Sequence, residues 1–275
     1  MTEPNNRFGI ELGLGKHQAY EDKYNPALLQ PIERQLCRQH LPLQLFNGVD
    51  IWTGYELSWL DTTGKPRVAV AEFAIPAASS HIIESKSFKY YLNSFNQTVI
   101  TDSELKRRLE EDLSRAAGAS VTVQITELSA YHTPPLQLQG FSCVDELPLS
   151  ASSYSPCLTL LQPSEASTQT EQKLYSHLLK SNCPVTGQPD WASVWVSIEG
   201  AHLLPESLLA YIVSYRAHQD FHENCVEQIY CDLWHALKPS ALWVYARYTR
   251  RGGLDINPFR CSHGQVPPSV KAARQ

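Results

Sequence analysis

The sequence predicts an α+β protein made of two similar halves, each with an antiparallel sheet. Three observations indicate this fold class. A hairpin of alternating strands opens each half, helical patterns follow, and another strand-like stretch closes each half. Because the halves share this plan but little sequence, the repeat is one of architecture.

The hairpin of the first half joins YELSWL (55–60) to PRVAVAEFAI (66–75). The intervening DTTGK contains a Thr-Gly pair, which is typical of a hairpin turn. The next stretch, HIIESKSFKYYLNSF (81–95), also alternates in part, as a strand does.

A helix is predicted after this stretch. Thr101 and Glu104 have the spacing of a capping box, leucines recur at every fourth position from Leu105, and Gly118 stops the pattern. VTVQITEL (121–128) is the predicted closing strand.

The second half repeats this plan. KLYSHLLKS (173–181) and WASVWVSIEG (191–200) are the predicted hairpin strands. Two helices are predicted next, at 205–216 and at 222–237, where Lys-Pro follows the last helical residue. ALWVYARYTRRGG (241–253) closes the half.

A connection separates the halves. Between about residues 129 and 170 the composition shifts to Pro, Ser, Thr and Gln, which is typical of a linker. We therefore expect an N-terminal half at residues 1–135, a connection at 136–170 and a C-terminal half at 171–275.

The overall composition limits the classes of partner and the cellular compartment that we expect. With 43% hydrophobic and 19% charged residues, the chain is typical of a soluble globular protein. A net charge of -5 argues against nucleic acid and anionic membranes as partners. No apolar run is long enough to cross a bilayer, and the polar N-terminus has no signal-peptide core. Seven cysteines without CxxC pairs fit a reducing compartment, so we expect a cytoplasmic protein.

Cys183 is the first candidate for chemistry. It lies in SNCPVTGQPD (181–190), where Pro184 and the Thr-Gly and Gln-Pro pairs predict a rigid loop. Asp190, at the far end of this loop, could reach back and exchange a proton beside the sulfur. A structural cysteine followed by a turn aspartate explains the same stretch equally well.

His222 and Glu223 begin a predicted helix. Glutamate is favoured there for purely electrostatic reasons. The functional interpretation is a carboxylate that accepts two N–H donors from a planar ring, with the imidazole adding a polar contact.

The same helix raises the possibility of zinc, because HENCVEQIYCDLWH contains His222, Cys225, Cys231 and His235. On a helix the first two share one face and the last two lie on the other. They do not converge as zinc ligands must, so we expect no metal site.

Two charged stretches have both a functional and an ordinary explanation. Glu84-Ser85-Lys86 with Lys89 is either part of a site or a solvated edge strand. The Arg251-Gly252 turn could hold phosphate or simply be solvated. No GxGxxG follows a strand, and GIELGLGK lacks P-loop spacing, so a dinucleotide would not bind in a Rossmann crevice.

Together these stretches resemble the NADPH-dependent 7-cyano-7-deazaguanine reductases (the QueF family) in their long form. The resemblance covers nearly the whole chain. It rests on LGKHQAYEDKYNPALLQPIERQ, DIWTGYELSWLDTTGKPRVAVAEFAIP, IESKSFKYYLNSFNQT, SNCPVTGQPDWASV, FHENC and YTRRGGLDINPFR. In the family, IESKSFK separates the nitrile reductases from zinc-dependent GTP cyclohydrolase relatives. The resemblance implies two tandem tunnelling-fold (T-fold) units, helices on one face of each sheet, and a homodimer with sites between halves or subunits.

The resemblance also implies roles for individual residues. Cys183 would add to the nitrile carbon and form a covalent thioimide, while Asp190 would supply a proton to the nitrogen. The product would be the aminomethyl compound used in queuosine biosynthesis for tRNA. The deazaguanine ring would be recognised by Ile83, Glu84, Ser85, His222 and Glu223. NADPH, two per nitrile, would be held by Ser85, Lys86, Arg251 and Gly252.

Two other functions remain open on the residues alone. A cysteine hydrolase of nitriles or amidines would use Cys183 and Asp190 without a reductant and would release ammonia. A purine-binding module without catalysis would be indifferent to the loss of Cys183. The presence of Cys183, Asp190 and Glu223 together argues against the binding module, and IESKSFK argues against the hydrolase through the resemblance.

Overall fold

The computed structural model describes residues 21–41, 46–132, 138–149, 153–165, 171–268, 272, 274 and 275. The GIELGLGK stretch and parts of the expected connection (residues 136, 137, 150–152 and 166–170) lie outside these ranges. Within the described part of the chain, no helix is both long enough and apolar enough to span a bilayer.

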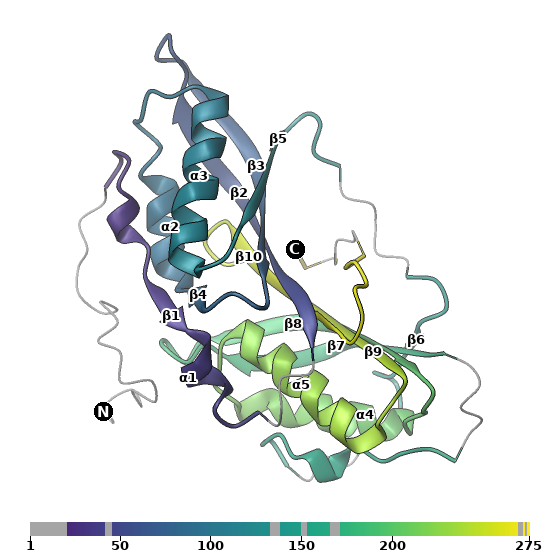
Figure 1. Cartoon of the computed structure of the whole chain (residues 1–275). Helices are drawn as coiled ribbons and strands as arrows, with labels where there is room; N and C mark the ends of the chain where they lie inside the picture. The colour runs from purple at the N-terminus through teal and green to yellow at the C-terminus, as the bar shows by residue number, and fades with distance from the viewer. Residues whose placement is uncertain are drawn as a thin grey trace.

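One eight-stranded sheet runs through both halves, in the order β5-β3-β2-β10-β9-β8-β7-β6 (Figure 1). Each neighbouring pair is antiparallel except the short β6–β7 pair. The predicted α+β class with antiparallel sheets is therefore confirmed. The strands are β2 (Asn47–Leu60), β3 (Pro66–Pro76), β5 (Thr122–Glu127), β6 (Ser142–Cys143), β7 (Gln172–Asn182), β8 (Pro189–Glu199), β9 (Ala241–Tyr248) and β10 (Leu254–Cys261).

The strand that joins the two halves, β10, was not predicted. It pairs with β2 along its whole length, from Leu254 opposite Gly54 to Cys261 opposite Asn47. Its pairing with β9 covers only the last three residues. The sheets of the two halves are consequently continuous, and the β9 and β10 strands diverge toward the turn that connects them.

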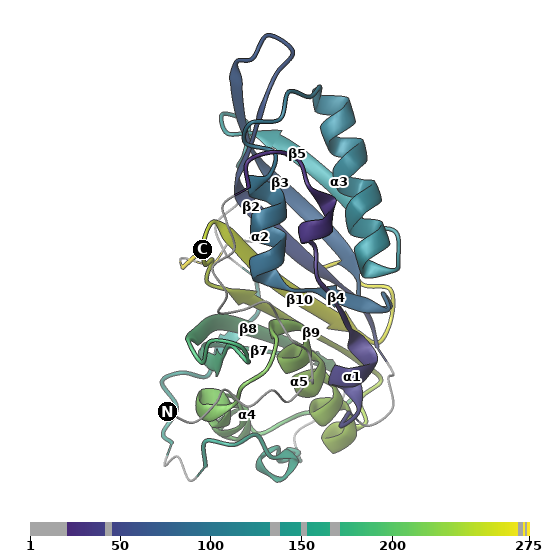
Figure 2. The same ribbon diagram turned by 90° about the vertical axis from the view of Figure 1, so that its left-hand side faces the viewer.

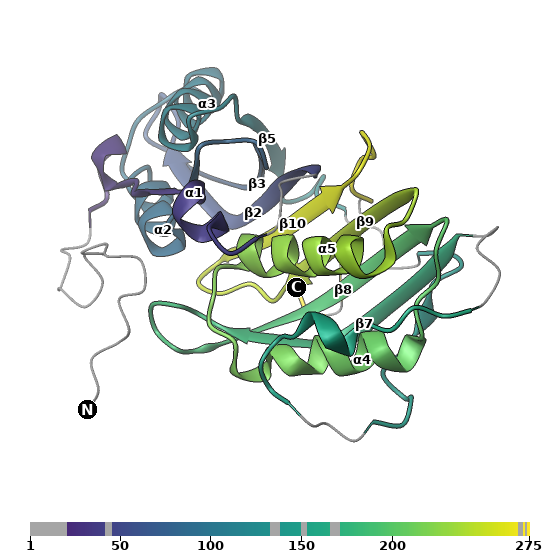
Figure 3. The same cartoon turned by 60° about the horizontal axis from the view of Figure 1, so that its bottom comes forward.

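Helices pack on one face of the sheet in each half. In the N-terminal half these are α2 (Ser85–Asn93) and α3 (Asp102–Ala117), which Figure 2 shows beside each other. In the C-terminal half they are α4 (Pro205–Val213) and α5 (His222–Leu237) (Figure 3). The shorter elements are α1 (Arg34–Arg38), a β1–β4 pair (Pro31–Glu33 and His81–Ile83), and the 3-10 turns η1 (Pro26–Leu28), η2 (Leu158–Leu160) and η3 (Ser214–Ala217).

The α3 and α5 helices confirm the sequence predictions. The Thr101 hydroxyl caps α3 by accepting from the Glu104 N–H, and Gly118 ends the helix with φ +69°. The three leucines of the pattern are fully buried. The α5 helix spans the predicted residues and ends at Lys238, which adopts a left-handed conformation before Pro239.

The partial strand character expected for residues 81–95 was wrong beyond Ile83. The Glu84 carboxylate accepts from the Lys86 and Ser87 N–H groups and so caps a helix at this point. Phe88 then fills the core in edge contact with Trp52 and Phe73. The cap and this packing favour a helix over the alternating pattern.

A buried network of ion pairs connects elements of the two halves. Asp50 of β2 pairs with Arg34 of α1 at 2.5 Å and with Arg260 of β10 at 2.7 Å. Glu227 of α5 pairs with Arg260 at 2.7 Å and with Arg38 at 2.6 Å. Elements of both halves thus depend on the same charges, and each buried charge has an opposite partner.

Candidate functional site

A cavity of about 530 Å³ lies between elements of the two halves. Its walls come from β4 and α2 on one side and from the β7–β8 loop, the start of α5 and the β9–β10 turn on the other. Nine of the ten predicted site residues line it: Ile83, Glu84, Ser85, Lys86, Cys183, Asp190, His222, Glu223 and Arg251.

Cys183 sits in the loop between β7 and β8, as predicted. Its N–H donates to the Gln188 carbonyl at 2.8 Å, and the Gly187 N–H donates back to the Cys183 carbonyl at 2.9 Å. Gly187 adopts φ +66°, which favours glycine. These bonds close the loop and hold a half-buried thiol at the cavity wall.

Asp190 is buried at the start of β8, beside Arg251 and His222. Its Oδ1 accepts from Arg251 at 2.5 Å, and its Oδ2 lies 3.3 Å from His222 Nε2. Burial alone would raise the pKa of Asp190, but the hydrogen bonds and charges of His222 and Arg251 outweigh burial and hold it below its usual value. The free site therefore carries Asp190 as a carboxylate.

The pKa of Glu223 is displaced in the opposite direction to that of Asp190. Its side chain is buried in the first turn of α5. Burial, followed by the negative charge of Asp50, raises the pKa of Glu223 to about 7, although Arg34 and His222 act in the lowering direction. Glu223 can therefore exist in either protonation state near neutral pH.

Glu84 has a structural task in addition to its place in the wall. Both of its carboxylate oxygens accept from N–H groups of α2, at 2.9 and 2.6 Å. Any ligand contact of Glu84 must use the remaining lone pairs. Ser85 and Lys86 begin the helix directly beside it.

Positive charge gathers at the mouth formed by α2 and the β9–β10 turn. Lys86 and Lys89 have no carboxylate partner among the described residues, and both line the cavity. Burial, reinforced by the charge of Arg251, lowers the pKa of Lys89. Gly252 is the one predicted site residue outside the lining, but it adopts φ +57°, and a Cβ there would contact the Lys89 side chain at 3.3 Å.

The cysteines and the last histidine of the zinc candidate in α5 lie in different surroundings. Cys225 and Cys231 are buried, and His235 is exposed. Within the described ranges, no group of three or more His, Cys, Asp or Glu side chains is arranged to hold a metal ion.

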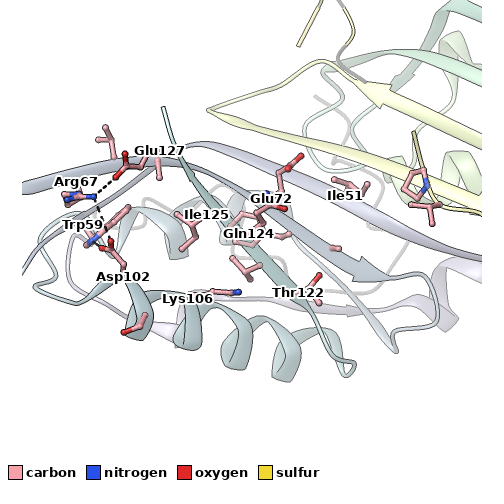
Figure 4. Close-up of a pocket in the computed structure, with 18 of the residues that line it drawn as sticks. Ile51, Trp59, Arg67, Glu72, Asp102, Lys106, Thr122, Gln124, Ile125 and Glu127 are labelled. Atoms are coloured by element: carbon pink, nitrogen blue, oxygen red, sulfur yellow. Dashed lines mark hydrogen bonds and ion pairs between the residues drawn. The ribbon is translucent and has the colours of Figure 1, made fainter. Parts of the chain in front are cut away.

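A larger cavity of about 840 Å³ lies along β3 and β5 of the N-terminal half (Figure 4). Arg67 pairs there with Glu127 at 2.9 Å, and Glu72 lies in the middle of the lining. None of the predicted site residues and no cysteine belongs to this lining. Thiol chemistry is therefore possible only in the smaller cavity of the two.

Sequence reasoning missed several residues of the smaller cavity. Gln188 accepts from Arg251 and so links the cysteine loop to the β9–β10 turn. Tyr248 of β9 stacks on the His222 ring. Lys89 belongs to a motif that the sequence singled out, but no role was assigned to it. The contacts of Gln188 and Tyr248 join distant segments, and no spacing in the sequence signals them.

Two family descriptions match the chain. The N-terminal part of a nitrile reductase, described as 7-cyano-7-deazaguanine reductase N-term, matches residues 20–125, and a QueF-like protein family matches residues 189–267.

Curated relatives match nearly end to end. A protein of Saccharophagus degradans is 52% identical over 267 residues, covering 95% of this chain and 98% of the relative. One of Teredinibacter turnerae is 54% identical over 268 residues, covering 94% of each. One of Bordetella avium is 51% identical over 268 residues, covering 95% and 97%. All three are named NADPH-dependent 7-cyano-7-deazaguanine reductase. Among solved structures, the archaeosine synthase QueF-Like in its apo form covers 38% of this chain at 22% identity, with a TM-score of 0.31 that is too low to compare folds.

Proposed function

This chain belongs to the NADPH-dependent 7-cyano-7-deazaguanine reductases, and from that premise we propose that the cavity between its halves is where the nitrile is reduced. The chain converts 7-cyano-7-deazaguanine to 7-aminomethyl-7-deazaguanine in queuosine biosynthesis. One observation carries the assignment of the site. Residues from positions 83–86, 183–190, 222–223 and 251, far apart in the chain, line a single cavity.

The first step is addition of Cys183 to the nitrile. Because its pKa is held low, Asp190 is a carboxylate that takes the proton of the Cys183 thiol and delivers it to the nitrile nitrogen. The sulfur–carbon bond forms while one carbon–nitrogen π bond is lost. The product is a thioimide on Cys183, with no net gain or loss of protons.

Reduction of this adduct needs NADPH, and the cavity mouth fits that cofactor. Lys86 and Lys89 have no carboxylate partner among the described residues, so they are free to pair with phosphate. Ser85, Lys86, Arg251 and Gly252 would hold the cofactor. When bound, NADPH supplies the hydrides, two per nitrile. Between the two, Cys183 leaves as a thiolate and the carbon–nitrogen double bond of an imine forms. Each reduction also consumes one proton from solvent, which Asp190, with its Oδ2 3.3 Å from His222 Nε2, passes to the nitrogen.

Ring recognition is assigned to His222, Glu223 and the β4–α2 junction. An ionised Glu223 accepts two N–H groups from the edge of the deazaguanine ring, and an analogue without these donors would leave a buried carboxylate unpaired. Ile83 is buried and supplies an apolar surface, with Glu84 and Ser85 next to it. His222 adds a polar contact.

We also propose a homodimer of two-half chains, with the halves at residues 1–135 and 171–275, acting in the cytoplasm. The exposed Val68 and Val266 beside the larger cavity support a further protein contact on that side. All seven cysteines are free, as a reducing compartment would keep them. Light scattering at micromolar concentration should give twice the chain mass, and a monomer would contradict the homodimer.

The test of the site is to trap the adduct. Incubation with 7-cyano-7-deazaguanine without NADPH should raise the intact mass by that of one substrate. Cys183→Ala should abolish this gain, while Cys143→Ala, at an exposed cysteine, should retain it. An adduct that persists in Cys183→Ala would refute the assignment. Ammonia release without NADPH would instead indicate the hydrolase.

A further inference from the structure

The imidazole of His222 lies flat against the phenol ring of Tyr248. The ring centroids are 3.8 Å apart and the planes differ by 3°. His222 is the first residue of α5 and Tyr248 is the last residue of β9, so this contact joins two elements that the chain does not connect directly. Tyr248 is fully buried and lies behind the cavity wall, because it is not among the lining residues.

His222 is constrained in two directions. Tyr248 covers a face of its ring, which fixes the plane of the imidazole. Asp190 lies at the edge, 3.3 Å from Nε2, which fixes the rotation within that plane. The Nδ1 atom is buried and has no hydrogen-bond partner in the described part of the chain, so no further polar contact from these residues orients the ring.

Tyr248 is itself held by the sheet. It lies opposite Ala192 in the β8–β9 ladder, and its N–H donates to the Asn257 side chain at 3.1 Å. This hydrogen bond links β9 to β10 at a point where the backbones of the two strands are no longer paired. The stacking surface offered to His222 therefore belongs to a rigid strand rather than to a loop.

We propose that Tyr248 is a positioning residue, which keeps the His222 ring oriented so that Nε2 stays on Asp190 and Asp190 stays directed for proton exchange with Cys183. This inference rests on the proposed function of the cavity. This role requires a flat aromatic face but not the hydroxyl group. Phenylalanine at position 248 should therefore keep the role, and an aliphatic side chain should lose it. A misplacement of about 1 Å in such a pair costs up to about a hundredfold in rate.

The experiment measures the rate of covalent adduct formation without NADPH, below the unfolding temperature of each variant. Tyr248→Phe should react within about twofold of the unaltered chain, and Tyr248→Leu at least about tenfold more slowly. Tyr245→Leu is the matched control, because Tyr245 is equally buried on the same strand but packs against Phe259 and Trp195. It should lose stability and keep the adduct rate. An unchanged adduct rate in folded Tyr248→Leu would overturn the proposal.

A second measurement separates this inference from the proposed function. Stacking shifts the His222 ring proton resonances upfield, and the shift should persist in Tyr248→Phe and disappear in Tyr248→Leu. If the unaltered chain forms no Cys183 adduct, the proposed function fails, and the resonances still report whether Tyr248 orients His222. Unchanged His222 resonances in Tyr248→Leu would refute the positioning role.

Discussion

Two carboxylates of one cavity, Asp190 and Glu223, have pKa values displaced in opposite directions. Burial would raise the pKa of Asp190, but the interactions with His222 and Arg251 hold it below its usual value. Glu223 is buried near the negative charge of Asp50, and its pKa rises to about 7. Such divergence separates roles: Asp190 suits proton exchange beside a thiol, and Glu223 suits a ligand that pairs with its ionised form.

The raised pKa of Glu223 predicts a pH-dependent KM for the nitrile. In the proposed binding mode the ionised carboxylate accepts both ring N–H groups, so KM should rise about tenfold for each pH unit below 7 and level off above it. Steady-state kinetics across this range would measure the effect. Glu223→Gln should remove the dependence and raise KM at alkaline pH, and Glu199→Gln, at an exposed site, should leave both unchanged. A flat KM profile for the unaltered chain would count against ring binding by Glu223.

The same pKa predicts a cost in stability. A carboxyl group with a raised pKa binds its proton more tightly in the folded state, so the contribution of Glu223 to the free energy of unfolding should fall as pH rises from about 4.5 to about 7. Glu223→Gln removes this cost. It should be more stable than the unaltered chain above pH 7, as measured by urea unfolding without ligand, and lower stability there would contradict the assignment.

At the scale of elements, tight turns and helix ends position the groups of the site. The β7–β8 loop carries Cys183, the cap of α2 places Ser85 and Lys86, and the β9–β10 turn carries Arg251. In this last turn Gly252 and Gly253 have φ +57° and +72°, which brings the backbone against Lys89 and Glu56. The turn therefore depends on glycine for both conformation and space.

Gly252→Ala should weaken NADPH binding more than nitrile binding. The left-handed conformation costs alanine about 1–2 kcal/mol, and the new Cβ would press on Lys89. Gly64→Ala is the control, because Gly64 has φ +81° in the β2–β3 hairpin and a Cβ added there would meet no described atom within 4 Å. Both variants should lose similar stability, and only Gly252→Ala should raise the KM for NADPH. An equal KM for NADPH in the two variants would show that the turn does not contact the cofactor.

The sequence predicts elements whose signal is local and misses those set by distant partners. The α3 helix was predicted because its cap and its leucine periodicity are local signals, and the end of α5 because Lys-Pro directly follows it. The β10 strand was missed because the polar residues Asp255, Asn257 and Arg260 interrupt the apolar pattern expected of a buried strand. Partners that allow their burial lie on other segments. In the site, Cys183 and Asp190 were recognisable because one loop contains both. The stacking of Tyr248 on His222 was not, because it exists only once β9 and α5 meet.

At the scale of the whole molecule, the cavity exists because the halves share one sheet and one ion network. Leu254 and Ile256 of β10 line the cavity, and Arg260 of the same strand pairs with Asp50 and Glu227. If the halves separated, these buried charges would become exposed and the cavity would open in the same event. The site and the junction between the halves should therefore be lost together.

Arg260→Met should destabilise the whole molecule by about 3–5 kcal/mol, because it leaves Asp50 and Glu227 buried with fewer partners. Arg107→Met removes two exposed ion pairs on α3 and should leave the free energy of unfolding nearly unchanged. Urea unfolding followed by tryptophan fluorescence would measure both. If Arg260→Met unfolds within about 1 kcal/mol of the unaltered chain, the network does not hold the halves together.

The proposed function depends on Cys183, whose covalent adduct in this cavity would make the nitrile reducible. The most direct measurement mixes the protein with 7-cyano-7-deazaguanine and NADPH and compares NADPH consumed with nitrile lost, alongside Cys183→Ala. We expect two NADPH consumed per nitrile and no consumption by the variant. Consumption by Cys183→Ala, or a nitrile that binds without any loss of NADPH, would contradict this role of Cys183.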